Sequence, residues 1–125
     1  MQPAKKLVTQ KQIDGREAEE IAALFLAQQG LVEVERNARC GRYEIDLIFR
    51  DTTRIHFVEV RYRKNDCHGG AATTITPSKL KKCILAAQLW LRKHNLEDSY
   101  FQLDVVAIDG ALTSPSLHWI TNITL

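Results

Sequence analysis

The chain has 125 residues, of which 45% are hydrophobic and 26% are charged, and its formal net charge is +2. This composition is ordinary for a globular protein and excludes extended disorder, except over residues 1–12, where we expect flexibility. No apolar run approaches the roughly 18 residues of a membrane span, no signal peptide opens the chain, and three cysteines without close spacing do not suggest disulfides or structural zinc. We therefore expect one cytoplasmic domain over residues 1–125.

The first predicted element is a helix from about Gly15 to Gln29. Asp14 is a suitable N-cap, and Gly30 is a suitable C-terminal stop. Glu19 falls on the flank of the apolar stripe, so we expect it at the seam between this helix and a sheet, although a solvated helix acid is the alternative. The stripe consists of Ala18, Ile21, Ala22 and Phe25.

The remaining elements alternate between strand and helix patterns. A second helix is expected to begin with Thr76 as N-cap and Pro77 in its first turn, and to end near His94. A polar loop precedes it, over residues 64–76. Strands are predicted over residues 31–36, 43–49, 54–63, 100–108 and 117–123. The order α-β-β-β-α-β-β predicts an α/β (α+β) fold with a mixed five-stranded sheet flanked by helices.

Two carboxylates interrupt strands that otherwise have the pattern of a protein core. Asp46 lies in Tyr43–Phe49, and Glu59 lies in the strand over residues 54–63. Acidic side chains are rarely buried without a partner, and alternation along neighbouring strands could bring these two together. Two adjacent carboxylates repel unless one is protonated or a cation neutralises them, and oxygen ligands favour Mg²⁺, Mn²⁺ or Ca²⁺. The alternative is that both acids form salt bridges to Arg61 or Arg63 in a half-exposed sheet.

Basic residues concentrate around these acids. Residues 36–64 contain eight Lys and Arg against four Asp and Glu, a local net charge of +4. A basic rim around an acidic centre would suit a polyanion held against a divalent metal, whereas a solvated arginine-rich face would account equally well for the composition.

The spacing Asp46…Glu59-x-Arg61 resembles the PD-(D/E)xK nuclease superfamily, which has the restriction-endonuclease-like fold. More narrowly, the chain resembles the bacterial YraN-type family, which is uncharacterised and endonuclease-like. The matching segments are Ala18-Glu19, Tyr43-Glu44-Ile45-Asp46-Leu47-Ile48, Phe57-Val58-Glu59-Val60-Arg61, Thr76-Pro77-Ser78-Lys79 and Gln102-Leu103-Asp104-Val105. The resemblance covers roughly residues 13–109.

The resemblance implies roles for individual residues. Asp46 and Glu59 would hold Mg²⁺ or Mn²⁺, with Glu19 as the third acid, and Arg61 would occupy the catalytic lysine position. Glu44 would support these acids or pair with an arginine. The implied nucleic-acid contacts are Lys79, Arg63 and Arg42. The implied activity is metal-dependent hydrolysis of DNA, including branched (Holliday-junction-like) or damaged DNA, and related resolvases work as dimers, which makes a homodimer compatible with this interpretation.

The chain departs from the family pattern at the motif lysine, because an arginine cannot act as a general base. Arg61 can still clamp a phosphate or stabilise developing charge. Tyr43 also replaces a glycine, and Gln102-Leu103 replaces Arg-Phe. These changes leave a second hypothesis open, in which the fold is retained as a weakly active or inactive module that binds nucleic acid or a protein.

Overall fold

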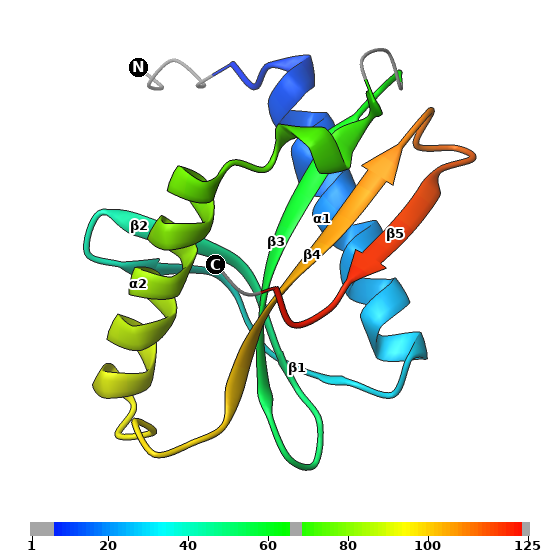
Figure 1. The fold of residues 1–125 in the computed structure, drawn as a ribbon. Coiled ribbons are helices and arrows are strands. Elements are labelled where there is room, and N and C mark those ends of the chain that lie inside the picture. Colours follow the sequence, from blue (N-terminus) through cyan, green and yellow to red (C-terminus); the bar gives the residue numbers. More distant parts are fainter. Residues whose placement is uncertain (1–6, 66–68, 124–125) are drawn as a thin grey trace, which may run out of the picture.

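The computed structural model describes residues 7–65 and 69–123, and it consists of one sheet with a long helix on each face (Figure 1). No helix among the described residues is both long and apolar enough to cross a membrane. The elements are α1 (Gln10–Gln28), β1 (Val32–Cys40), β2 (Tyr43–Arg50), β3 (Ile55–Arg63), the short 3₁₀ helix η2 (Ala71–Thr74), α2 (Pro77–Lys93), β4 (Phe101–Asp109) and β5 (Ser116–Ile120).

The five strands lie in the sheet in chain order, β1-β2-β3-β4-β5. Strands β1, β2 and β3 form an antiparallel meander, β4 pairs parallel with β3 through the α2 crossover, and β5 returns antiparallel at the far edge. The predicted mixed five-stranded sheet with flanking helices is confirmed, and it is consistent with the restriction-endonuclease-like core. The crossover places the start of α2 beside β2 and β3.

Each helix packs on its own core. On the α2 face, the rings of Phe57 and Trp90 pack edge to face, with their centroids 5.7 Å apart. On the α1 face, Leu26 packs with Leu47 and Phe49, all fully buried. Central strands covered on both sides have near-continuous apolar sequences, which is why a buried carboxylate in β3 needs a specific partner.

Helix α1 begins one turn earlier than predicted. Thr9, not Asp14, is the N-cap: its hydroxyl accepts from the Gln12 N–H, and the Gln12 side chain accepts from the Thr9 N–H. Asp14 instead lies inside the helix and accepts from the Gln10 side chain at 2.8 Å. Residues 10–12 are therefore ordered helix rather than flexible chain, whereas residues 1–6 lie outside the described part. The predicted Thr76 N-cap and Pro77 first turn of α2 are confirmed.

The regular alternation expected along β2 is wrong at one point. Leu47 and Phe49 face α1 and Ile48 faces α2, as alternation requires, but Ile45 also faces α2. In the paired strand, Asn37 has a left-handed backbone (φ 48°), yet β1 continues through it to Cys40, beyond the predicted end of the strand at residue 36. Asp46 lies between Ile45 and Leu47 in β2, at the place where the alternation breaks.

The predicted polar loop before α2 contains an unpredicted turn of helix, η2. The Ala71 N–H donates to Asp109 at the end of β4 at 2.6 Å. Arg61 donates to the Thr74 hydroxyl at 2.8 Å and to the Thr74 carbonyl at 3.1 Å. These bonds hold η2 against the ends of β3 and β4.

Candidate acid-pair site

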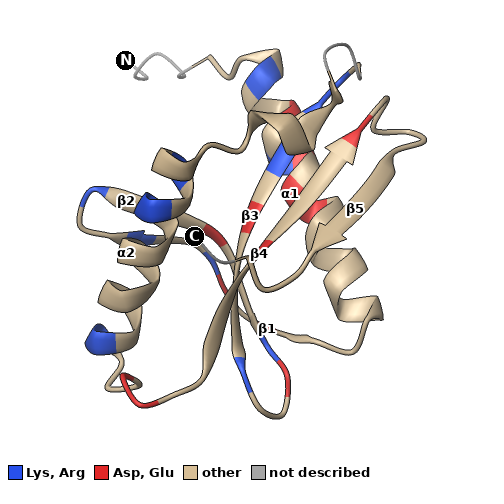
Figure 2. Ribbon diagram, in the orientation of Figure 1, with Lys and Arg blue, Asp and Glu red and all other residues tan. Residues whose placement is uncertain are grey.

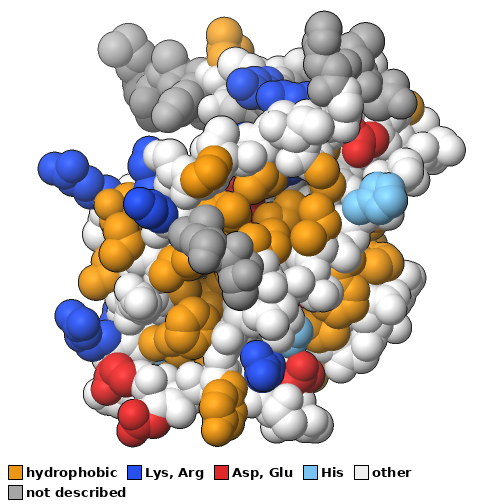
Figure 3. All heavy atoms as spheres, viewed as in Figure 1, with side chains coloured by type: hydrophobic (Ala, Val, Ile, Leu, Met, Phe, Trp, Pro, Cys, Tyr) orange, Lys and Arg blue, Asp and Glu red, His pale blue; other side chains and the backbone are white. Residues whose placement is uncertain are grey.

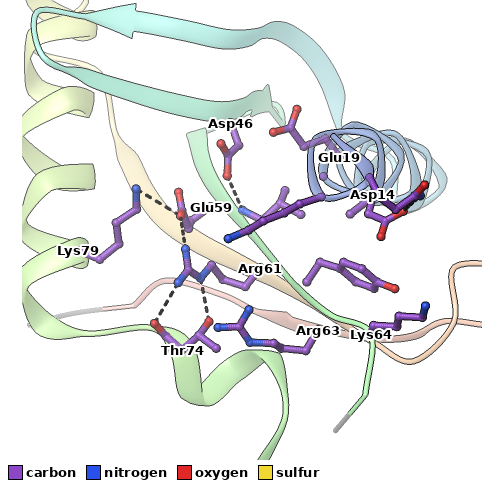
Figure 4. A pocket seen from close by; sticks show the side chains of 15 residues that line it. Asp14, Glu19, Asp46, Glu59, Arg61, Arg63, Lys64, Thr74 and Lys79 are labelled. Atoms are coloured by element: carbon purple, nitrogen blue, oxygen red, sulfur yellow. Dashed lines mark hydrogen bonds and ion pairs between the residues drawn. The ribbon is translucent and has the colours of Figure 1, made fainter. Parts of the chain in front are cut away.

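The carboxyl groups of Asp46 and Glu59 come together between the two helices (Figure 4). The paired residues of β2 and β3 run from Arg50 and Ile55 to Leu47 and Val58. Beyond Leu47 and Val58, the Asp46 carboxylate accepts the Val60 N–H at 2.9 Å. This bond turns the Asp46 carboxyl toward Glu59, close enough for each group to affect the ionisation of the other.

Burial and mutual repulsion make this pair costly to ionise. The side chain of Glu59 is only 5% exposed, and burial, followed by the charge of Asp46, raises the pKa of Glu59 to about 7. Burial also raises the pKa of Asp46, against the lowering effect of the Val60 N–H. The two carboxyls do not both ionise readily, so an added cation would stabilise their fully ionised form.

Two cations already stand beside Glu59. The Lys79 ammonium lies 3.6 Å from Glu59 Oε1, and Arg61 Nη1 lies 3.5 Å from the same atom (Figure 4). The salt-bridge interpretation therefore holds for Glu59 and Arg61, but at a buried rather than half-exposed acid. Because Arg61 Nε and Nη2 donate to Thr74, this guanidinium also anchors η2.

Glu19 approaches the pair from α1 but is held to one side. Asn37 donates to Glu19 Oε2 at 3.1 Å and to Glu44 Oε1 at 3.0 Å. Burial raises the pKa of Glu19, with Asp46 adding repulsion. Asn37 thus links two of the predicted acids, a role that the sequence patterns did not indicate. Glu44 has this amide as its partner rather than the arginine we considered.

Two clefts open at the acid pair. The first, of about 720 Å³, lies between α1, the end of β3 and η2, and both acids, Glu19, Arg61 and Arg63 line it. The second, of about 640 Å³, lies between the β1–β2 hairpin and α2, and Arg42, Glu44 and Asp46 are among its lining residues. Lys79 and Asp46 line both clefts. The sequence-predicted residues therefore gather around one centre, with Arg63 and Arg42 on opposite sides of it.

The donor chemistry of the pair fits a hard divalent cation. Both members supply carboxylate oxygen, the ligand that Mg²⁺ and Mn²⁺ prefer, and Mg²⁺ often uses only one or two protein carboxylates beside water and phosphate. Within residues 7–65 and 69–123, no three His, Cys, Asp or Glu side chains group closely enough to form a complete metal site. The ligands that fit are therefore Asp46 and Glu59. Glu19 lies near this pair but does not join it.

Residues 18–108 match the uncharacterised protein family UPF0102. The chain belongs to this family. A UPF0102 protein of Marinomonas sp. is 42% identical over 123 residues, which cover 96% of this chain and 97% of the relative. A UPF0102 protein of Pseudomonas fluorescens is 44% identical over 113 residues, covering 89% and 92%, and one of Herminiimonas arsenicoxydans is 40% identical over 114 residues, covering 91% and 88%. The YraN-type resemblance of the sequence is confirmed as family membership.

This UPF0102 chain also contains a buried polar network that the sequence patterns missed. His56 Nδ1 lies 2.7 Å from Asp104 Oδ2, and His56 Nε2 lies 2.9 Å from Asp51 Oδ2. Asp104 is 0% exposed and also accepts from Trp119 Nε1 and the Asn122 N–H. Neither Asp104 nor His56 was among the candidate site residues of the sequence. An acid between Leu103 and Val105 was the one available signal of burial.

The network lies on the β3–β4–β5 part of the sheet rather than at the clefts. It connects the β2–β3 turn to strands β3, β4 and the segment after β5. Both ring nitrogens of His56 lie within hydrogen-bond distance of a carboxyl oxygen, so the imidazole bridges Asp51 and Asp104. We assign this network to holding the sheet together, not to the chemistry of the acid pair.

Proposed function

We propose that this UPF0102 protein is a cytoplasmic, metal-dependent nuclease that hydrolyses phosphodiester bonds in DNA, including branched or damaged DNA. The observation that carries the proposal is that Asp46 and Glu59, whose charges influence each other, line one cleft together with lysine and arginine. A divalent ion would stabilise the ionised form of two acids that otherwise resist ionisation. The flanking cations would bind a phosphate.

Asp46 and Glu59 would hold Mg²⁺ or Mn²⁺. When bound, such an ion polarises a phosphodiester and lowers the pKa of a coordinated water. The Val60 N–H fixes the orientation of the Asp46 carboxylate, which limits reorganisation of this ligand. Lys79, half-exposed at the first turn of α2, is placed to contact a phosphate oxygen at the junction of the clefts.

Arg61 supports this proposal in a different way from the motif lysine. It cannot take a proton from water, and its Nε and Nη2 are already used by Thr74. Its role is to hold η2, and through it the entry to α2, while Nη1 balances the charge of Glu59. Proton removal would then fall to metal-activated water, without a side-chain base at position 61.

One observation favours the second candidate, a nucleic-acid-binding module without cleavage. Lys79 and Arg61 already partner Glu59, and the described residues provide two grouped carboxylates rather than three. If this internal pairing outcompetes a metal ion, the clefts bind but do not cut.

Cleavage assays separate the two functions. Branched, single-stranded and duplex DNA are incubated with the full chain and Mg²⁺ or Mn²⁺, beside Asp46→Asn and Glu59→Gln. Metal-dependent cleavage that both substitutions abolish supports the nuclease. Cleavage that survives both substitutions refutes this site, and binding without cleavage under every metal and substrate supports the module. Lys81→Ala, on the same helix as Lys79 but outside both clefts, is the matched control.

A further inference from the structure

The cleft between the β1–β2 hairpin and α2 contains more positive charge than the acid pair needs. Arg39 and Arg42 line it from the hairpin, and Lys79 and Lys82 line it from α2. The two lysines are three residues apart, so they lie on one face of the helix. Lys and Arg lie over the hairpin and the start of α2 in Figure 2, and basic side chains gather at that edge of the molecule in Figure 3.

The acids of this second cleft do not neutralise these cations. Four cations and two carboxylates, those of Glu44 and Asp46, line it, and only one of the four cations, Lys79, already pairs with an acid of the site, Glu59. Glu44 is bonded to Asn37, and Asp46 belongs to the acid pair. The outer part of the cleft, where Arg39 and Lys82 lie, therefore favours an anion that extends beyond the acid pair.

The two clefts adjoin at the acid pair. Asp46 and Lys79 line both clefts, and Glu59 lines the first, so a strand that passes from one cleft to the other would cross the acid pair. Lys64 and Arg63 line the far side of the first cleft, as Arg39 and Arg42 line the second. A path with cations on both sides of its centre fits a polymer of phosphates better than a single terminal phosphate.

The size of the clefts indicates what fits inside them. Volumes of about 720 and 640 Å³ are in the range of pockets that enclose a small molecule, so each cleft has room for a few nucleotides of one strand. Half-buried Tyr43 stands on the wall of the second cleft among the cations. A cationic groove with an aromatic side chain is the combination that single-strand-binding proteins use.

We propose that a single-stranded nucleic acid segment lies along both clefts, with its backbone held by Arg39, Arg42 and Lys82 on the hairpin side of the acid pair. This inference rests on the proposed function for the position of the scissile bond, and it specifies the substrate as an unpaired strand. The inference also predicts that Arg39 and Lys82 contact the nucleic-acid backbone. It predicts that the bound segment is the interior of a strand rather than its end.

Binding is measured by fluorescence anisotropy with a short labelled oligothymidylate and a blunt duplex of the same length, in EDTA and over a range of salt. The single strand should bind more tightly than the duplex. Arg39→Ala and Lys82→Ala should each lower the slope of log affinity against log salt by about 0.7, which is roughly fivefold in affinity at about 0.1 M salt. Arg50→Ala and Lys81→Ala remove the same charge outside both clefts and should change neither quantity.

The inference is overturned if the duplex binds as tightly as the single strand, or if the control substitutions weaken binding as much as the cleft substitutions. Cleavage assays with Mn²⁺, run beside the binding assays, distinguish failure of this inference from failure of the nuclease proposal. A strand that binds as expected but is never cut refutes the nuclease and leaves the groove standing. Normal cutting with unchanged KM in both cleft variants refutes the groove and leaves the nuclease standing.

Discussion

Glu59→Gln should make the protein more stable at alkaline pH while removing the candidate activity. Glu59 is buried beside Asp46, and its pKa is raised to about 7 even with Lys79 and Arg61 in contact. Above that pH the native state contains a carboxylate whose ionisation its surroundings disfavour. Glutamine has nearly the same shape and no charge, so it removes this cost and leaves most of the packing.

The magnitude follows from linkage between proton binding and folding. In the window between pH 4.5 and about 7, folded Glu59 retains a proton that the unfolded chain has released, so stability falls as pH rises through it. At about 1.4 kcal/mol per pKa unit, the full shift is worth roughly 3 kcal/mol. Since the cost is complete only above the folded pKa, Glu59→Gln should be near neutral at about pH 5 and stabilising by up to roughly 3 kcal/mol at about pH 8.

Urea unfolding of the wild type and Glu59→Gln in EDTA, at both pH values, measures this difference. Saturating Mg²⁺ should then stabilise the wild type but not the variant, because a ligand that binds only the native state adds to its stability. Loss of stability in Glu59→Gln at the higher pH would refute the reasoning, since it would mean that Lys79 and Arg61 more than compensate the buried charge. Glu97→Gln, at an exposed glutamate, is the control and should show no such pH dependence.

Three further substitutions test the supporting structure. His56→Ala leaves buried Asp104 without its imidazole partner and should lower the free energy of unfolding by about 3–5 kcal/mol in urea titrations. Arg61→Ala should release η2 from its Thr74 anchor, which limited proteolysis would detect as faster cutting before α2 with little change in the core. Gly70→Ala should lower Tm, because φ at position 70 is 85° and an added Cβ would lie 2.8 Å from a carboxylate oxygen of β4.

The sequence predicted the parts of the site that depend on local patterns. Strand periodicity puts Phe57 and Glu59 on one face of β3, and in the structure that face meets α2. Thr76 followed by Pro77 marked the start of α2, which puts Lys79 beside Glu59. Each of these inferences needs only neighbouring residues.

Features that depend on contacts between distant segments were not predictable in the same way. Alternation alone would place Ile45 on the face opposite to that of Ile48, but in the structure both face α2, and the neighbouring Asp46 accepts the Val60 N–H from β3. The Asn37 side chain donates hydrogen bonds to Glu19 and Glu44, which lie 18 and 7 residues away in the sequence. No pattern within β1 contains that information.

The buried His56–Asp104 pair illustrates the same limit. The two residues are 48 positions apart and meet only because β3 and β4 pair in parallel across the α2 crossover. The start of α1 is a different case, because the Thr9-x-x-Gln12 capping box was present in the sequence and Asp14 was the wrong choice between two signals.

Joint binding of a divalent cation by Asp46 and Glu59 can be observed by anomalous diffraction from a crystal of the full chain grown with Mn²⁺, beside Asp46→Asn grown identically. We expect an anomalous peak in contact with both carboxylates, with the Lys79 ammonium displaced from Glu59, and loss of that peak in the variant. A wild-type crystal without a peak at the pair, and with Lys79 still on Glu59, would contradict it.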